Sequence, residues 1–440
     1  MKKHSRLLVI PALLISLSTT AQEVKSVNSG DSLSLNEAIN RIVSTYPSVL
    51  KADNDIEAFS ARIALAKSAF LPNIEANASY AHIGPVSEIT LQGLGSFSLN
   101  PADNYSAALS VSQLVADFGK SKRSVEVEQI NSNIAKLTSD QLKQRLSISG
   151  AASFYSMLYL SEAVKIKEEE IANLNEHLRY VQKKTATGSA TDYQILATEV
   201  RISTAENQRT DLINTLNVQR CYINLLMGFD RNNMTPFKKE ISELSAPKAE
   251  EELIETAFAN REEVKIAAER IGLTSAKMKQ SDAQNNPTLS LLASGGVKNG
   301  YIPDQMALKA NYSVGAGLKV PIFDANRTKY NKRQIEVEAK SASYDLELSK
   351  LSIVNEVVEC RANVESALKR VRQSQLQLVQ AERAYRLAKT SFEAGSITNL
   401  DLLDASNTLS ESKLNLLKSK IDYTLNSIRL KVATGEKIYR

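Results

Sequence analysis

Two long segments of this chain contain almost none of the residues that end helices. Residues 326–394 hold no glycine or proline, and residues 120–187 hold only Gly150. At about 1.5 Å of rise per residue, each segment can form one helix on the order of 100 Å long. A compact globular domain has no place for such a rod, so the sequence predicts a molecule that spans a distance.

The first 21 residues are typical of a secretory signal peptide. Three basic residues precede a short apolar stretch, residues 7–17, and small residues lead up to Ala21. We expect cleavage after Ala21 and no lipid anchor, because no cysteine follows the apolar stretch. Cleavage removes three cations and no acid, which lowers the net charge from +5 to +2. A nearly neutral chain lacks the basic surface that binds nucleic acid, so no nucleic-acid partner is expected.

The same order of landmarks occurs twice along the chain. Pro72 aligns with Pro287 at an offset of 215 residues, and Gly188 aligns with Gly395 at an offset of 207. Each half therefore predicts a helix, a strand, a loop, a second strand, a very long helix, a tight turn and a returning helix.

The expected boundaries follow from this alignment. The first repeat covers 22–228, a linker covers 229–249, the second repeat covers 250–435, and 436–440 form the C-terminal end. The first repeat is expected to contain a helix at 35–69, strand-loop-strand at 72–116, a long helix at 119–187 and a returning helix at 191–227. The second is expected to contain a helix at 250–283, strand-loop-strand at 287–323, a long helix at 326–394 and a returning helix at 398–434.

The two turns have further helix signals. A glycine suits the left-handed conformation that ends many helices. Thr191 and Thr398 come shortly after the glycines, with Gln194 and Asp401 three residues further on. This spacing predicts a capping box at the start of each returning helix. The last returning helix also has coiled-coil periodicity, from Leu414 to Val432.

The predicted strands alternate in polarity. Tyr312, Val314 and Leu318 share one side of residues 311–320, and polar residues or glycines occupy the other side. Alternating segments of about ten residues are typical of outer-membrane β-barrels, although a small soluble sheet is an alternative. Four strands cannot close a barrel, since the smallest have about eight, and an open edge in lipid leaves backbone groups unpaired. The sequence thus predicts that two, three or four copies share one barrel.

Several segments resemble the TolC-like outer-membrane efflux and secretion channels, the outer membrane factors. The resemblance covers essentially the whole chain after residue 21. It rests on SLNEAINRIVSTYPSV, LPNIEANASY, LVADFGKSKR, VPIFDANR and FEAGSITNLDLLDA, the last covering residues 392–405.

This resemblance implies a mainly α protein with transmembrane β-strands. Three identical chains would form one twelve-stranded barrel in outer-membrane lipid, continued by a hollow α-helical tunnel through the periplasm of a Gram-negative bacterium. The implied function is a passive exit duct of a tripartite efflux or type I secretion system. Its implied partners are a periplasmic adaptor (membrane fusion) protein and an inner-membrane pump.

The resemblance also implies a pore aperture at the helical turns. Asp401 and Asp404 occupy positions where the family has a ring of aspartates, and Phe392 and Gln194 lie at the same level. Asp401 has the alternative role of a capping residue. A related channel has an arginine where this chain has Ile397, and an acid is expected where it has Gln194, so the sequence argues against a salt-bridge lock.

The exposed turns are the implied contacts for the adaptor. They comprise Gly188, Ser189, Ala190, Thr191, Asp192, Gly395, Ser396, Ile397, Thr398 and Asn399.

The sequence contains no pattern that indicates catalysis. HExxH, GxSxG, phosphate-loop and CxxC motifs are absent, and His82 and His177 are isolated. We therefore expect no enzyme activity, cofactor or metal. Cys221 and Cys360 lie 33 and 35 residues from their turn glycines, so either a disulfide or two free thiols is possible. Two other functions stay open: a secreted or surface coiled-coil structural or adhesion protein, which explains only the rods, and a solute porin, which explains only the strands.

Overall fold

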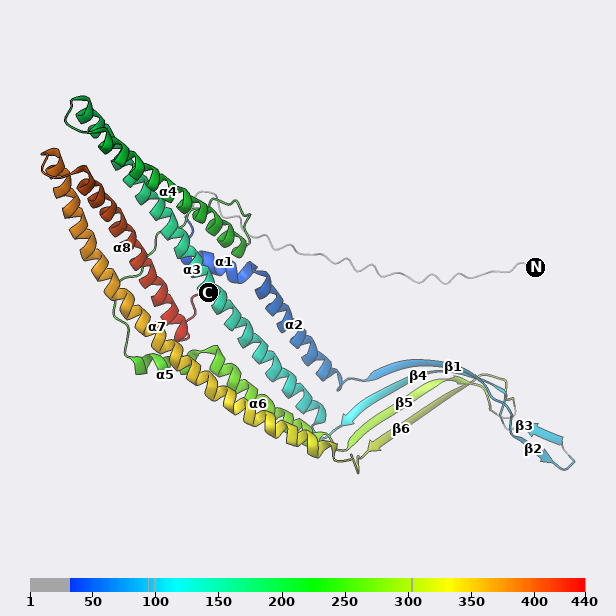
Figure 1. Cartoon of the computed structure of the whole chain (residues 1–440). Helices are drawn as coiled ribbons and strands as arrows, with labels where there is room; N and C mark the ends of the chain where they lie inside the picture. Colours follow the sequence, from blue (N-terminus) through cyan, green and yellow to red (C-terminus); the bar gives the residue numbers. More distant parts are fainter. Residues whose placement is uncertain (1–31, 94, 99, 302–303, 440) are drawn as a thin grey trace, which may run out of the picture.

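The computed structural model describes residues 32–93, 95–98, 100–301 and 304–439. The expected signal peptide, residues 1–21, lies outside these ranges. Figure 1 shows an elongated molecule with a four-stranded sheet at one end and two helical hairpins at the other.

The eight helices have matching lengths in the two halves of the described chain. They are α1 (Leu35–Thr45), α2 (Pro47–Ser68), α3 (Lys120–Ala186) and α4 (Asp192–Leu226), then α5 (Glu250–Asn260), α6 (Glu262–Ala283), α7 (Arg327–Glu393) and α8 (Asn399–Ala433). Each half contains helices of 11, 22, 67 and 35 residues in that order. At about 1.5 Å per residue, α3 and α7 are each roughly 100 Å long.

The first helix of each half is broken, so the prediction of continuous helices over 35–69 and 250–283 was wrong. Tyr46 interrupts the first with extended backbone (φ −70°, ψ 130°). Pro47 explains this break, because a proline disfavours helical geometry at the preceding residue and is itself well placed at the start of a helix. Arg261 interrupts the second helix with nearly the same angles (φ −64°, ψ 132°), although no proline follows it.

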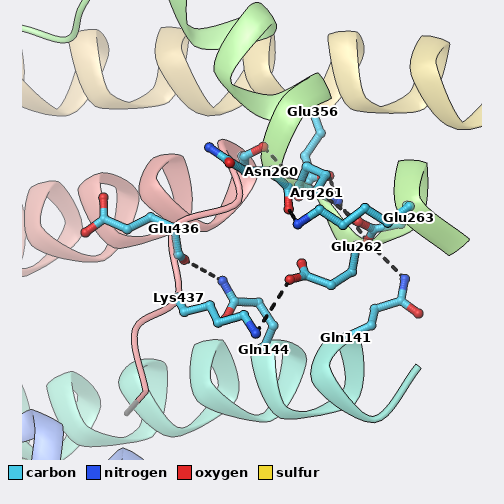
Figure 2. Close-up of polar contacts among 11 residues, drawn as sticks. Gln141, Gln144, Asn260, Arg261, Glu262, Glu263, Glu356, Glu436 and Lys437 are labelled. Carbon is cyan, nitrogen blue, oxygen red and sulfur yellow. Dashed lines mark hydrogen bonds and ion pairs between the residues drawn. The ribbon is translucent and has the colours of Figure 1, made fainter. Parts of the chain in front are cut away.

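Contacts of the Arg261 side chain hold the second break (Figure 2). The residue is 8% exposed. Its guanidinium lies 2.9 Å from a carboxylate oxygen of Glu263 and 2.8 Å from one of Glu356 on α7. It also donates to the carbonyl of Ala433 at the end of α8 (3.3 Å), and Gln141 of α3 donates to Glu263 (2.9 Å). This group of residues, the Arg261 network, therefore joins four helices midway along the rods.

Both halves place an arginine at the end of the returning helix. In the first half the Nε of Arg41 donates to the carbonyl of Met227, the residue that follows α4, at 2.9 Å. In the second half Arg261, which aligns with Tyr46 and not with Arg41, donates to the carbonyl of Ala433, the last residue of α8. Each arginine binds a carbonyl that has no partner within its own helix.

The four-stranded sheet is antiparallel and has the order β1-β4-β5-β6. Its strands are β1 (Asn73–His82), β4 (Asp103–Ala116), β5 (Thr288–Lys298) and β6 (Lys309–Lys319). A small hairpin of β2 (Glu88–Leu91) and β3 (Gly95–Ser98), which the sequence did not predict, lies in the loop between β1 and β4. In the described part of the chain, β1 and β6 each pair on one side only, so the sheet has two open edges.

The two faces of the sheet differ in polarity. One face holds apolar side chains that the single chain leaves uncovered, including Ile74, Leu109 and Val314 at 63%, 56% and 78% exposure. The other face is polar; for example, the hydroxyls of Ser79 and Ser106 lie 2.7 Å apart. An uncovered apolar surface of this kind indicates contact with a partner or with lipid.

The apolar cores lie among the helices. One core joins α1, α3 and α4 around Ile39, Phe154 and Ile223, and another joins α5, α7 and α8 around Val357 and Tyr423. Together these cores fix α1 and α5 against the long helices.

Among the described residues, no helix combines the length and the apolar composition that a membrane crossing requires.

Candidate functional site at the helical tips

The turns that end α3 and α7 share one hydrogen-bonding pattern. The amides of Gly188 and Gly395 donate to the carbonyl three residues earlier, at 2.9 and 3.0 Å. The amides of Ser189 and Ser396 donate to the carbonyl five residues earlier, at 2.8 Å in both turns. Both glycines are left-handed, with φ of 76° and 74°. This is the Schellman arrangement, and it requires a residue that tolerates positive φ.

The returning helices begin differently. In α8 the hydroxyl of Thr398 accepts from the amide of Asp401 (3.2 Å), and the Asp401 carboxylate accepts from the amide of Thr398 (2.9 Å). The predicted capping box is therefore confirmed there. The corresponding prediction for Thr191 was wrong, because the Thr191 side chain makes no capping bond. The amide of Gln194 bonds instead to the backbone carbonyl of Thr191 at 3.0 Å.

The two candidate aperture acids have different surroundings within one chain. Bonds from the Thr398 hydroxyl and amide lower the pKa of Asp401 and keep it ionised. The Asp404 carboxylate lies 2.6 Å from the guanidinium of Arg201 on α4. This ion pair was not predicted from the sequence; the expected lack of a salt-bridge lock concerned the positions of Ile397 and Gln194, which carry no charge. The cation comes from α4 and not from the position next to the turn, where the chain has Ile397.

Phe392 packs in an apolar cluster at the tip. It is 6% exposed and contacts Val181 of α3 and Leu402 of α8, with Ile397 partly buried against them. The cluster joins both hairpins, so packing contributes to holding the tips together.

A buried polar chain lies next to this cluster. The Nε2 of His177 on α3 is 2.6 Å from the Oδ1 of Asn399 on α8. The Asn399 amide group donates to the carbonyl of Gln194 and to the hydroxyl of Thr198, both at 3.3 Å. Asn399 is 4% exposed, so its side chain binds inside the chain and links α3, α4 and α8.

The imidazole of His177 has a lowered pKa. Burial opposes its protonated form and outweighs the hydrogen bond to Asn399, which acts in the other direction. Its ring centre lies 5.1 Å from that of Phe392 in an edge-on arrangement. A small cavity of about 130 Å³ beside these rings is also lined by Tyr180, Tyr385 and Lys389.

The described residues contain no group of three or more His, Cys, Asp or Glu side chains that could hold a metal ion.

Most of the chain matches one protein-family model. Residues 38–228 and 253–436 match the family described as outer membrane efflux protein. The chain belongs to the outer membrane efflux protein family. The resemblance to TolC-like channels inferred from its motifs is therefore confirmed.

Known relatives of this efflux protein are similar along much of their length. The outer membrane protein TolC of Escherichia coli K12 is 22% identical over 412 residues, which cover 88% of this chain and 79% of that protein. TolC of Vibrio cholerae serotype O1 is 27% identical over 184 residues, which cover 39% of this chain and only 42% of that protein.

A solved structure has the same fold. The CmeC outer membrane channel of Campylobacter jejuni superposes with a TM-score of 0.74 at 14% identity, covering 98% of this chain and 94% of that one. The efflux protein thus has the fold of the outer-membrane channels.

Membership of the family places the efflux protein in the outer membrane of a Gram-negative bacterium, extending into the periplasm. Its relatives are named as channels, efflux proteins and secretion proteins, and not as enzymes. These findings favour an export duct over a secreted coiled-coil protein or a solute porin. The two cysteines of the efflux protein are free thiols. Burial raises the pKa of Cys360 to about 11, which makes its thiol unreactive.

Sequence reasoning missed Arg201 and His177 as residues of the tips. At the offset of 207, His177 aligns with Ala384 and Arg201 aligns with Thr408. Both are polar or charged residues without a counterpart in the other half. A polar or charged residue that is present in only one half could have indicated these two positions. Residues shared by both halves maintain the common fold, whereas residues present in one half can form contacts between the halves.

Proposed function

We propose that this protein is the passive outer-membrane exit duct of a tripartite efflux or type I secretion system and is built from three copies of the chain. The observation that carries the proposal is the open sheet, which has two unpaired edges and an uncovered apolar face. The sheet is joined to helices about 100 Å long. An open edge in lipid costs several kcal/mol for each unpaired backbone group. The edge strands β1 and β6, of 10 and 11 residues, match in length, so β6 of one copy can pair with β1 of the next.

Each of the three copies would supply four strands of the barrel and two long helices, so that the assembly would contain twelve strands. The equal helix lengths of the two halves support a chain of two structural repeats, 22–228 and 250–435, joined by the linker 229–249. In this assembly the long helices and their returning partners continue the barrel as a tunnel. Apolar side chains that one chain exposes along α7, such as Tyr330, Val337 and Tyr344, would be covered by neighbouring helices.

The tips would form the inner end of the tunnel. The turn residues Gly188 to Asp192 and Gly395 to Thr398 are the proposed contacts of the adaptor. Asn399, which was among the contacts implied by the sequence, is buried at 4% exposure, so its side chain is not available for such a contact. Asp401 and Asp404 would line the aperture as six carboxylates, at the level of Phe392 and Gln194. Carboxylates around a narrow water path attract cations.

The assembly is tested by expressing the full chain in a Gram-negative host and separating the membranes. We expect the mature protein in the outer-membrane fraction, with an unheated gel band of three times the chain mass. Electron microscopy of the purified particle should show threefold symmetry. A water-soluble monomer would refute the proposal.

The docking role is tested by crosslinking from the tips. A photoreactive residue at Ser189 or Ser396, both exposed, should crosslink a periplasmic adaptor in cells. The same residue at Lys340, exposed on α7 near the sheet, is the matched control and should give no adaptor product. Equal yields from all three positions would contradict docking at the tips.

The aperture role is tested by bilayer conductance. Asp401→Ala combined with Asp404→Ala should weaken block by divalent cations added on the helical side. Thr398→Ala is the control, because it removes the capping hydroxyl but keeps both acids. If the double variant behaves like the wild type, Asp401 has a capping role only.

A further inference from the structure

Two lysines are paired with each other where β5 ends and β6 begins. Figure 1 shows that this end of the sheet lies away from the helices. Lys298 ends β5 and pairs directly with Lys309, which begins β6. On its other side Lys298 pairs with Ser106 of β4, and Ser106 pairs with Ser79 of β1. One register row, the lysine row, therefore crosses all four strands and contains two hydroxyls and two ammonium groups.

The pairing of Lys298 with Lys309 is unfavourable for the sheet itself. Side chains directly opposite each other have Cβ atoms about 4.5–5.5 Å apart, and like charges in these positions destabilise the pair. In the described part of the chain no carboxylate lies within 4.0 Å of the ammonium group of Lys298 or Lys309. The nearby Asp304 accepts hydrogen bonds from two amides of its own loop, at 3.1 and 3.2 Å. The Lys298 ammonium lies 5.1 Å from the centre of the Tyr301 ring, a contact that does not neutralise its charge. Among the described residues, the fold thus leaves two close positive charges without a carboxylate partner.

The lysine row lies on the polar face of the sheet. Because side chains alternate along a strand, Lys309 shares its face with Asn311 and Ser313, and Lys298 shares its face with Ser294. The apolar residues Val297 and Tyr312 lie on the opposite face. If the apolar face meets lipid, as the proposed function requires, both lysines point into the water-filled bore.

We propose that the lysine row forms a binding site for polyvalent anions at the outer mouth of the duct. This inference rests on the proposed function, since three copies of the row give a ring of six ammonium groups and six serine hydroxyls. The ammonium groups donate hydrogen bonds, and of the two serine hydroxyls in each row, which lie 2.7 Å apart, one remains free to donate; such donors suit a polyphosphorylated or polycarboxylate solute.

On the polar face of the four strands no carboxylate lies close to the lysine row, although the loop before β6 carries Asp304. The nearest carboxylate on β1 is that of Glu75, four residues from Ser79, or about 13 Å along the strand. The potential of six like charges is screened over about 10 Å at 0.1 M salt, so it extends into the bore. A charged passage of this kind raises the local concentration of opposite ions by a factor of about ten or more. The outer mouth therefore concentrates anions, whereas the acids proposed at the inner end attract cations.

The test measures block of the full-length trimer in planar bilayers by inositol hexakisphosphate. The probe is added to one side at a time in 0.1 M salt. We expect block from the sheet side at about tenfold lower concentration than from the helical side. Lys298→Gln combined with Lys309→Gln should raise the half-blocking concentration from the sheet side about tenfold. The double arginine variant, Lys298→Arg with Lys309→Arg, keeps the charges and should retain the block.

Lys319→Gln is the matched control. Lys319 lies on the same strand and the same face as Lys309, ten residues away, but pairs with the neutral Thr288. Its substitution should change the half-blocking concentration less than about twofold, because the residue lies roughly 33 Å from the ring.

Three results separate this inference from the proposed function. If inositol hexakisphosphate blocks the wild type at the same concentration from both sides, the inference is overturned; this result does not require any variant to assemble. A conducting double glutamine variant with wild-type block also overturns it, while the duct itself stands. If the wild-type chain forms no trimer and no channel, the proposed function fails first and the inference fails with it.

Discussion

The Arg261 network gives the sharpest prediction about what holds the rods in place. We expect Arg261→Met to destabilise the junction of α5, α6 and the end of α8. Removing one partner of a buried ion pair costs about 3–5 kcal/mol, because the other charge is left buried. Arg261 has two acidic partners. The Glu356 side chain is 44% exposed and can return to water, whereas that of Glu263 is only 27% exposed.

The expected cost is therefore at the lower end, about 3 kcal/mol. Glu263 keeps its hydrogen bond from Gln141, which limits the loss further, while the carbonyl of Ala433 loses its donor. Since every 1.4 kcal/mol is a factor of ten, about 3 kcal/mol corresponds to roughly a hundredfold increase in local opening.

Hydrogen exchange followed by mass spectrometry measures this opening directly. Peptides from residues 250–270 and 425–437 should lose about two orders of magnitude of protection, and peptides from the sheet should not change. Arg361→Met is the control, since the guanidinium of Arg361 lies 3.5 Å from Glu250 with both side chains partly exposed. Pairs of this kind contribute about 1 kcal/mol or less. Equal effects of the two substitutions would refute the assignment of stability to the buried network.

The pH dependence of the network has a definite sign. Burial acts to raise the pKa of Glu263, but bonds from Arg261 and Gln141 outweigh it, and the pKa lies below its ordinary value of 4.5. A carboxyl with a lowered pKa stabilises the folded state above its unfolded pKa, and this stabilisation is lost as pH falls through the folded pKa. Protection at the junction should therefore decrease below about pH 4.5 and should depend less on pH in Arg261→Met.

Three further predictions concern other parts of the chain. Burial lowers the pKa of His177 below 6.5, so protonation of its imidazole favours the open state, and the tips should open more as the pH falls from 7.5 through the folded pKa. Hydrogen exchange, corrected for its intrinsic pH dependence, measures this opening, and the response should be lost in His177→Gln. A Cβ at Gly296 would lie 2.2 Å from a carbonyl oxygen of β4, so Gly296→Ala should disrupt the pairing of β4 with β5 and abolish the heat-resistant oligomer. Gly315→Ala is the control: a Cβ at Gly315 would meet no neighbouring atom within 4 Å, so this variant should keep the oligomer. Alkylation of the unfolded chain without reductant should modify both Cys221 and Cys360; a single or absent modification would contradict two free thiols.

The long helices and alternating strands could be predicted because their signals are local. The absence of glycine and proline from residues 326–394 is enough to predict α7, and alternation over 311–320 is enough to predict β6. The glycines at the turns require positive φ, which is also a local property. Features of this kind depend on residues that are neighbours in sequence.

The polar contacts of the tips could not be predicted in this way. Arg201 and Asp404 are 203 residues apart, and His177 and Asn399 are 222 apart. Whether two such side chains meet depends on how each helix is rotated about its axis and on the level at which the hairpins align. A repeat in sequence predicts equivalent positions in each half, but it does not predict which unmatched residues bind one another across the halves.

The breaks at Tyr46 and Arg261 have nearly the same backbone angles, but only one of them could be predicted from the sequence. Pro47 explains the break at Tyr46 from two adjacent residues, so that break was readable in the sequence. At the offset of 215, Pro47 aligns with Glu262, which has no such effect on the residue before it. The break at Arg261 instead depends on Glu356 and Ala433, which lie 95 and 172 residues further along the chain. Nearly equal angles at Tyr46 and Arg261 thus have a local cause in one half and a tertiary cause in the other. Since the tertiary cause forms only when α7 and α8 are packed, the second break is coupled to assembly of the rods, whereas the first is fixed by proline before any packing occurs.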